Sequence, residues 1–235
     1  MKTATVADRS TARAAGLVYI LVGITGAFGI AVVPKLLIVP GDPAATADRI
    51  LGSEWMFRLG IAGELVNAVA FIFLVLTLQR LFKSTDEWLA SLMVIIVLVS
   101  IPISFTNELN ALAALGLLSA PDGLSAFDKH QVETLASVFL RLHSIGFVVN
   151  SIFWGLWLLP LGRLVVRSDF APRALGNLVI LAGVAYVITV FASVLVLPFG
   201  DIASSAAIVF EGVGEVSMIV WLLIFGAKRS AASRD

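Results

Sequence analysis

Runs of about 20 apolar residues constrain this chain more than any other feature, because a helix of that length crosses the hydrocarbon core of a bilayer. Hydrophobic residues make up 59% of its 235 residues and charged residues only 14%, whereas soluble domains carry about 25% charged residues. Six segments qualify as membrane spans: 14–33, 57–81, 88–109, 134–158, 175–197 and 205–227. We therefore predict an all-α, polytopic membrane helix bundle of six spans, forming a single domain over residues 1–235 in contact with the lipid bilayer.

Composition and missing motifs exclude several classes of function. The formal net charge is zero, which argues against nucleic acid as a partner. The absence of cysteine excludes disulfides, thiolate metal ligands and a cysteine nucleophile. The sequence also contains no P-loop, dinucleotide fingerprint or GxSxG motif. These absences favour a non-enzymatic protein, and no catalytic residue is predicted.

Lysine and arginine are divided unevenly between the two sides of the predicted membrane domain. When the six spans alternate in direction, eleven of the sixteen basic residues fall on the side of the two termini. Because basic residues collect on the cytoplasmic side of membrane proteins, we predict a multi-pass protein of the cell membrane with both termini in the cytoplasm. The basic residues on that side are Lys2, Arg9, Arg13, Arg80, Lys83, Arg163, Arg167, Arg173, Lys228, Arg229 and Arg234.

The two longer external loops contain helix-start signals. In VPGDPAATADRI, Asp42 is suited to cap a helix and Pro43 to occupy its first position, so we expect a short surface helix before the second span. In SAPDGLSAFDKHQVETL, a turn is expected at 121–123 and a new helix near Ser125.

Polar residues inside the spans provide the candidate site. At 1.5 Å per residue, Glu64, His143 and Glu215 are expected about 12–15 Å from the outer surface, Glu211 about 9 Å deep, and Glu108 close to that surface. Helical spacing gives spans two, three, four and six a polar face at overlapping depth. We therefore predict one outward-facing polar pocket between these spans, with candidate ligand-binding residues Arg58, Glu64, Asn67, Asn107, Glu108, His143, Asn150, Glu211 and Glu215.

Three functions fit such a pocket. The first is binding or transport of a small molecule, an ion or a proton, and because six spans are few for a transporter, a homodimer is expected. In the second, Arg58 and Arg141 pair with the glutamates and the polar cluster only locks the helices together. The third is an intramembrane metal-dependent or acid–base enzyme. Carboxylate and imidazole groups bind divalent metals, and the metal-ligand candidates are Glu64, His143 and Glu215, with Glu108 beside them.

The two tyrosines of the chain lie in similar sequences. AGLVY at 15–19 resembles AGVAY at 182–186, and Gly63-Glu64 is matched by Gly214-Glu215. One hypothesis is that spans one and two form a parallel repeat of spans five and six, as in many transporters. The alternative is a coincidence between apolar helices.

A family resemblance extends over nearly the whole chain, from Ala12 to Phe225. The segments ARAAGLVY, KLLIVPGDPAATA, FRLG, NELNALAAL, LSAF, HSIGF, LPLGRLV, FAPRALG and GEVSMIVWLL resemble a bacterial integral membrane family known as domain of unknown function 4386. The resemblance implies a location in the bacterial inner membrane and supports the fold, but it implies no activity. Arg58, Asn107, His143 and Glu215 match the family pattern, whereas His130 and Glu211 do not.

Overall fold

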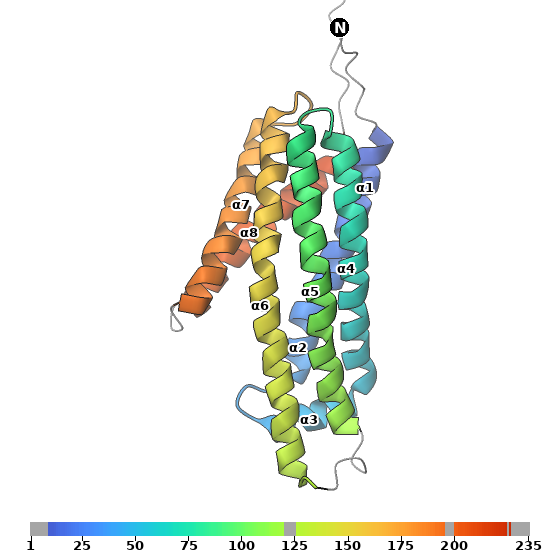
Figure 1. Cartoon of the computed structure of the whole chain (residues 1–235), viewed down its shortest axis with the longest axis vertical. Helices are drawn as coiled ribbons and strands as arrows, with labels where there is room; N and C mark the ends of the chain where they lie inside the picture. The colour runs from blue at the N-terminus through green and yellow to red at the C-terminus, as the bar shows by residue number, and fades with distance from the viewer. Residues whose placement is uncertain (1–8, 120–125, 196–199, 225, 227–235) are drawn as a thin grey trace, which may run out of the picture. The chain divides into compact units, whose positions relative to one another are not determined.

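The computed structural model describes residues 9–119, 126–195, 200–224 and 226, with the side chains of 200–211 left undescribed. This part of the chain contains helices and no strand (Figure 1). Eight segments are α-helices and one is a π-helix. In chain order they are α1 (Arg9–Gly26), η1 (Ala27–Val32, the π-helix), α2 (Val33–Leu37), α3 (Pro43–Gly52), α4 (Glu54–Phe82), α5 (Glu87–Ser119), α6 (Lys129–Arg167), α7 (Arg173–Leu195) and α8 (Gly200–Ile224).

Five helical stretches are long and apolar enough to cross a membrane. They are Arg9–Leu37, Glu54–Phe82, Glu87–Ser119, Lys129–Arg167 and Arg173–Leu195, with mean hydropathies between 1.6 and 2.6. The structure thus confirms an all-α, multi-pass membrane protein in contact with lipid. In the predicted sixth span, the described apolar helix Gly212–Ile224 is shorter. The count of six spans and the side on which the termini lie remain predictions.

Two helices run well beyond the predicted ends of their spans. The third span was expected to end at Leu109, but α5 continues to Ser119. The following residues, ALAALGLLS, are mostly strong helix formers. Glu108 therefore lies inside a helix and not at its end, and it is only 4% exposed. Likewise α6 spans 39 residues, or about 58 Å, which exceeds the roughly 30 Å of a hydrocarbon core.

The chain divides into two compact units that share its long helices. Unit 1 comprises Met1–Ile20, Ala70–Ser100 and Val148–Asp235, and unit 2 comprises Leu21–Val69 and Ile101–Phe147. Helices α1, α4, α5 and α6 each contribute one part to each unit, whereas α7 and α8 belong wholly to unit 1.

Unit 2 has an apolar core to which α2, α3, α4, α5 and α6 all contribute. Val33, Ile50, Phe57, Leu115 and Leu140 represent the five helices in this core. Burial of each such side chain contributes about 1.5–3 kcal/mol, so α3 is held to its unit by Ile50, which is 0% exposed.

Local capping sets the starts of α3 and α6. The Asp42 side chain accepts a hydrogen bond of 2.9 Å from the Ala45 backbone N–H, and Pro43 begins α3, which confirms the predicted surface helix. At α6, Asp128 and Gln131 form reciprocal backbone–side-chain hydrogen bonds of 2.9 Å, a capping box. The helix therefore begins at Lys129 and not near Ser125, which lies outside the described residues together with the predicted turn at 121–123.

Unit 1 is held together by close helix contacts at glycine. A Cβ atom on Gly183 of α7 would lie 2.7 Å from the Gly155 carbonyl oxygen of α6, and one on Gly214 of α8 would lie 2.7 Å from the Cβ of Ala182. Small residues of this kind allow membrane helices to approach closely.

Candidate metal centre

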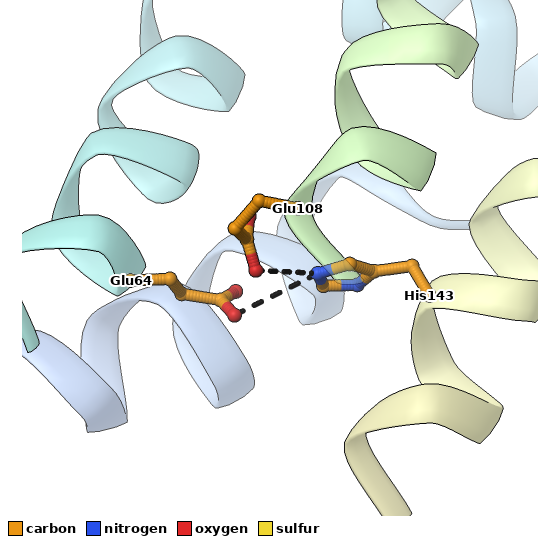
Figure 2. Close-up of side chains that lie close together, drawn as sticks. All are labelled: Glu64, Glu108 and His143. Carbon is orange, nitrogen blue, oxygen red and sulfur yellow. Dashed lines mark hydrogen bonds and ion pairs between the residues drawn. The ribbon is translucent and has the colours of Figure 1, made fainter. Parts of the chain in front are cut away.

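Three ionisable side chains from three helices of unit 2 converge on one point. Glu64 extends from α4, Glu108 from α5 and His143 from α6 (Figure 2). The Nε2 atom of His143 lies 3.0 Å from Glu108 Oε1 and 3.6 Å from Glu64 Oε2. One potential ligand atom from each residue lies within 4.8 Å of the other two. We call these three residues the Glu–Glu–His cluster.

The cluster is largely shielded from solvent. The side chains of Glu64, Glu108 and His143 are 13%, 5% and 18% exposed. The second carboxyl oxygen of Glu108, Oε2, is buried and has no hydrogen-bond partner among the described residues. An unpartnered buried carboxyl oxygen is costly, so this atom is available for a ligand that the cluster would enclose.

A π-helix and a glycine bring the first span against Glu64. A Cβ atom on Gly29, in η1, would lie 2.5 Å from Glu64 Cγ and 3.1 Å from Glu64 Oε1. Pro34 follows η1 and has no N–H to donate to the preceding turn, which accounts for an irregular helix here. Such π-helical turns are frequent at functional sites. The contact between Gly29 and Glu64 was not predicted from the sequence.

Asn107 holds the backbone of α6 next to the cluster. Its Nδ2 donates a hydrogen bond of 3.0 Å to the carbonyl oxygen of His143. Gly146, one turn further along α6, leaves room for the amide, because a Cβ atom there would overlap Asn107 Oδ1. Asn107 therefore helps to orient the helix that carries His143.

The other predicted site residues of unit 2 do not join the cluster. Arg58 forms an ion pair of 2.7 Å with Glu54, and its side chain is 53% exposed. Asn67 donates hydrogen bonds to the Val22 carbonyl oxygen at 2.6 Å and to Thr25 Oγ1 at 3.2 Å, joining α4 to α1.

Three predicted site residues belong to unit 1. Asn150 is buried in α6. Glu211 lies in α8, but its side chain is outside the described residues. Glu215 also lies in α8, where it is half-buried.

The donor set of the cluster suits a divalent metal ion. Ligand atoms bound to one metal at about 2.0–2.2 Å lie about 3–4 Å apart, which is close to the separations found here. Carboxylate oxygen and imidazole nitrogen together suit Zn²⁺, Mn²⁺ or Fe²⁺. The structure thus pairs two of the three predicted metal-ligand candidates, Glu64 and His143, with Glu108.

Fold and site together define a multi-pass helical membrane protein with a buried Glu–Glu–His cluster. The chain belongs to the family described as Domain of unknown function (DUF4386), whose model matches residues 14–226. This match confirms the resemblance found in the sequence. No curated protein and no solved structure matches the chain.

Proposed function

We propose that the protein binds a divalent first-row transition metal ion, Zn²⁺ or Mn²⁺, at the Glu–Glu–His cluster. The observation that carries the proposal is the convergence of donor atoms from Glu64, Glu108 and His143 within 4.8 Å. Each donor comes from a different helix, so the bound ion would also tie α4, α5 and α6 together.

Charge balance supports a divalent ion. Two ionised carboxylates beside a neutral imidazole carry a charge of −2, which one divalent cation neutralises. If both carboxyl groups are ionised, a protonated His143 leaves one negative charge uncompensated in a buried site, and uncompensated charges at membrane depth are costly. A metal ion would also provide a partner for Glu108 Oε2, which lacks a hydrogen bond among the described residues.

A role limited to helix adhesion explains these features less well. Polar interactions between membrane helices contribute about 0.6 kcal/mol on average, and one His–Glu pair would provide that. The cluster adds a second carboxylate, Glu64, packed against Gly29. For adhesion alone, an ionised second acid would add a charge that must be compensated.

An exchangeable ion is favoured over a permanent structural one. Structural zinc sites usually have four protein ligands, whereas three leave a coordination position open to water or another ligand. The segments 38–53, which contains α3, and 126–128 of unit 2 belong to the side predicted to be poor in lysine and arginine, which is the external side by the positive-inside rule. We therefore infer that the ion enters from outside, which suits binding or transport.

Metal titration of the purified full-length chain in lipid nanodiscs tests the proposal. We expect the wild-type protein to bind one Zn²⁺ or Mn²⁺ ion per chain in isothermal titration calorimetry. Glu108→Gln keeps the shape of the side chain but removes its charge. We expect it to weaken binding by at least the roughly 10–100-fold seen when an outer-shell partner of a metal ligand is lost.

Glu133→Gln is the matched control. Glu133 is a buried carboxyl group of the same unit, 5% exposed compared with 4% for Glu108. It precedes His143 by ten residues on α6, or about 15 Å along the helix. Its replacement should leave metal affinity unchanged. Absence of metal binding by the wild type, or equal loss of affinity in both variants, would overturn the proposal.

A further inference from the structure

Unit 1 carries a basic surface at the ends of four of its helices. Each of the basic side chains there is exposed. They are Arg9 and Arg13 of α1, Arg80 of α4, Lys83 just after α4, Arg163 and Arg167 of α6, and Arg173 of α7. We call these seven residues the basic face.

Side-chain contacts bring these helix ends together. Arg167, the last residue of α6, forms an ion pair with Asp86, which follows Lys83 in the turn between α4 and α5. Phe82 at the end of α4 stacks on Phe170 in the turn between α6 and α7, with ring centroids 5.4 Å apart. The C-terminal ends of α4 and α6 and the N-terminal end of α7 therefore lie side by side.

The start of α1 joins the same end of unit 1 through α8. Trp221 of α8 stacks on Phe170, with ring centroids 6.0 Å apart. A Cβ atom on Gly226, just after α8, would lie 3.3 Å from Arg9 Cγ. The first turn of α1 therefore lies at the end of unit 1 that carries the other basic residues.

The basic face has an excess of positive charge. In these helix ends and the turns that join them, the acidic residues of the described chain are Asp86, Glu87 and Asp169. Of the seven basic side chains, Arg167 is the one with an ion pair within the described part of the chain. The remaining charges are not neutralised by the protein there, so the face attracts anions.

Trp88 indicates the depth of the basic face in the membrane. It is the second residue of α5 and is 70% exposed. It follows Asp86, the ion-pair partner of Arg167, by two residues. Tryptophan in membrane proteins is enriched at the level of the lipid headgroups. The basic face therefore lies where lipid phosphates are within reach.

An apolar stripe on α1 continues from the basic face. Leu17, Leu21 and Ile24 follow Arg9 and Arg13 at helical spacing, so the five side chains lie along one side of the helix. The three apolar side chains are 63%, 44% and 64% exposed. This side of α1 thus presents positive charge at one end and apolar surface beyond it, which matches the headgroup and acyl chains of an anionic phospholipid.

We propose that the basic face binds the headgroup of an anionic phospholipid whose acyl chains lie along the apolar stripe of α1. Arginine donates paired hydrogen bonds to phosphate oxygens, and lysine provides a compact positive charge. A zwitterionic phospholipid has the same phosphate and acyl chains, but its own cation cancels the charge that the face attracts. Basic surfaces at the ends of membrane helices recognise anionic headgroups in this way. The proposal does not depend on metal binding in unit 2.

Native mass spectrometry of the full-length chain in detergent tests the proposal by counting bound lipids. The probes are dioleoylphosphatidylglycerol and dioleoylphosphatidylcholine, which have the same acyl chains and differ in headgroup charge. One basic residue near an anionic headgroup contributes about fivefold in affinity. We therefore expect the wild-type protein to bind its first phosphatidylglycerol at least about fivefold more tightly than phosphatidylcholine.

Paired substitutions locate the site. Arg9→Gln combined with Arg13→Gln should weaken phosphatidylglycerol binding by about fivefold or more and leave phosphatidylcholine binding unchanged. Arg9→Lys combined with Arg13→Lys keeps the charge and should retain the preference. The matched control, Lys35→Gln combined with Lys129→Gln, removes two exposed charges from unit 2 and should also retain it. Equal affinity of the wild type for both lipids, an equal loss in the control, or displacement of phosphatidylglycerol by the same concentration of inorganic phosphate would overturn the proposal.

Discussion

Replacement of Gly29 by alanine tests whether the first span sets the geometry of the Glu–Glu–His cluster. The new methyl group would lie 2.5 Å from Glu64 Cγ and 3.1 Å from the Gly60 carbonyl oxygen. The backbone oxygen has little freedom to move, so the side chain of Glu64 must rotate away. Rotation would withdraw the Glu64 carboxylate from His143, 3.6 Å away in the native arrangement.

Gly29→Ala should change both the folding stability and the metal affinity of the protein. Overpacking costs about 1–3 kcal/mol, whereas glycine to alanine in a helix returns about 1 kcal/mol. The net loss of folding stability should therefore be about 0–2 kcal/mol. Loss of an outer-shell contact that orients a metal ligand lowers affinity by about 10–100-fold, or about 1.4–2.8 kcal/mol of binding free energy. The expected loss of binding free energy is therefore similar to, or larger than, the expected loss of folding stability.

Gly23→Ala provides the control on the same span. A Cβ atom on Gly23 would have no atom within 4 Å, so its added methyl group should leave metal affinity unchanged. Both variants would be compared with wild type by calorimetry with Zn²⁺ and by thermal unfolding in nanodiscs. Wild-type metal affinity in Gly29→Ala would refute the inference that Gly29 positions Glu64.

Three further predictions concern other parts of the chain. Gly146→Ala should displace Asn107, because the new Cβ atom would overlap the Asn107 amide. Metal binding measured by calorimetry should weaken about 10-fold, and unchanged affinity would contradict a positioning role for Asn107. Asp42→Ala removes the cap of α3 and should cost about 1 kcal/mol of stability in thermal unfolding, with metal affinity unaffected; an equal loss of affinity would link α3 to the site. The chain has no cysteine, so a maleimide labels only a cysteine that is introduced. From the predicted orientation, an impermeant maleimide should label Lys129→Cys in intact cells but Lys83→Cys only after permeabilisation. Labelling of both in intact cells would contradict that orientation.

Local signals in the sequence predicted much of the secondary structure. Hydropathy identified five spans that the structure bears out. A segment that crosses a bilayer must satisfy its own backbone hydrogen bonds, so a long apolar segment is enough to predict a helix. Asp42 and Pro43 predicted the start of α3 because capping involves neighbouring residues only. Hydropathy, however, ended the predicted third span too early. A polar pair such as Asn107 and Glu108 lowers the hydropathy of a segment even when both side chains face the protein interior.

The partners of the buried polar residues were harder to predict. Depth and helical spacing placed Glu64, His143 and Glu215 at one level and suggested a single pocket. In the structure, Glu64 and His143 meet Glu108 in unit 2, whereas Glu215 belongs to unit 1. Depth along a helix follows from residue number, but the direction of a side chain between helices depends on helix rotation and contact distance.

By itself, the sequence determined that this is a helical multi-pass membrane protein and which residues carry its unusual buried charge. These properties depend on apolar length, local capping and residue type. The tertiary structure alone decided which charges meet. Gly29 in a π-helix sets Glu64 against the first span, and Gly155 and Gly183 bring α6 and α7 into close contact. Contacts between residues far apart in the chain depend on how whole helices pack, which no local pattern specifies.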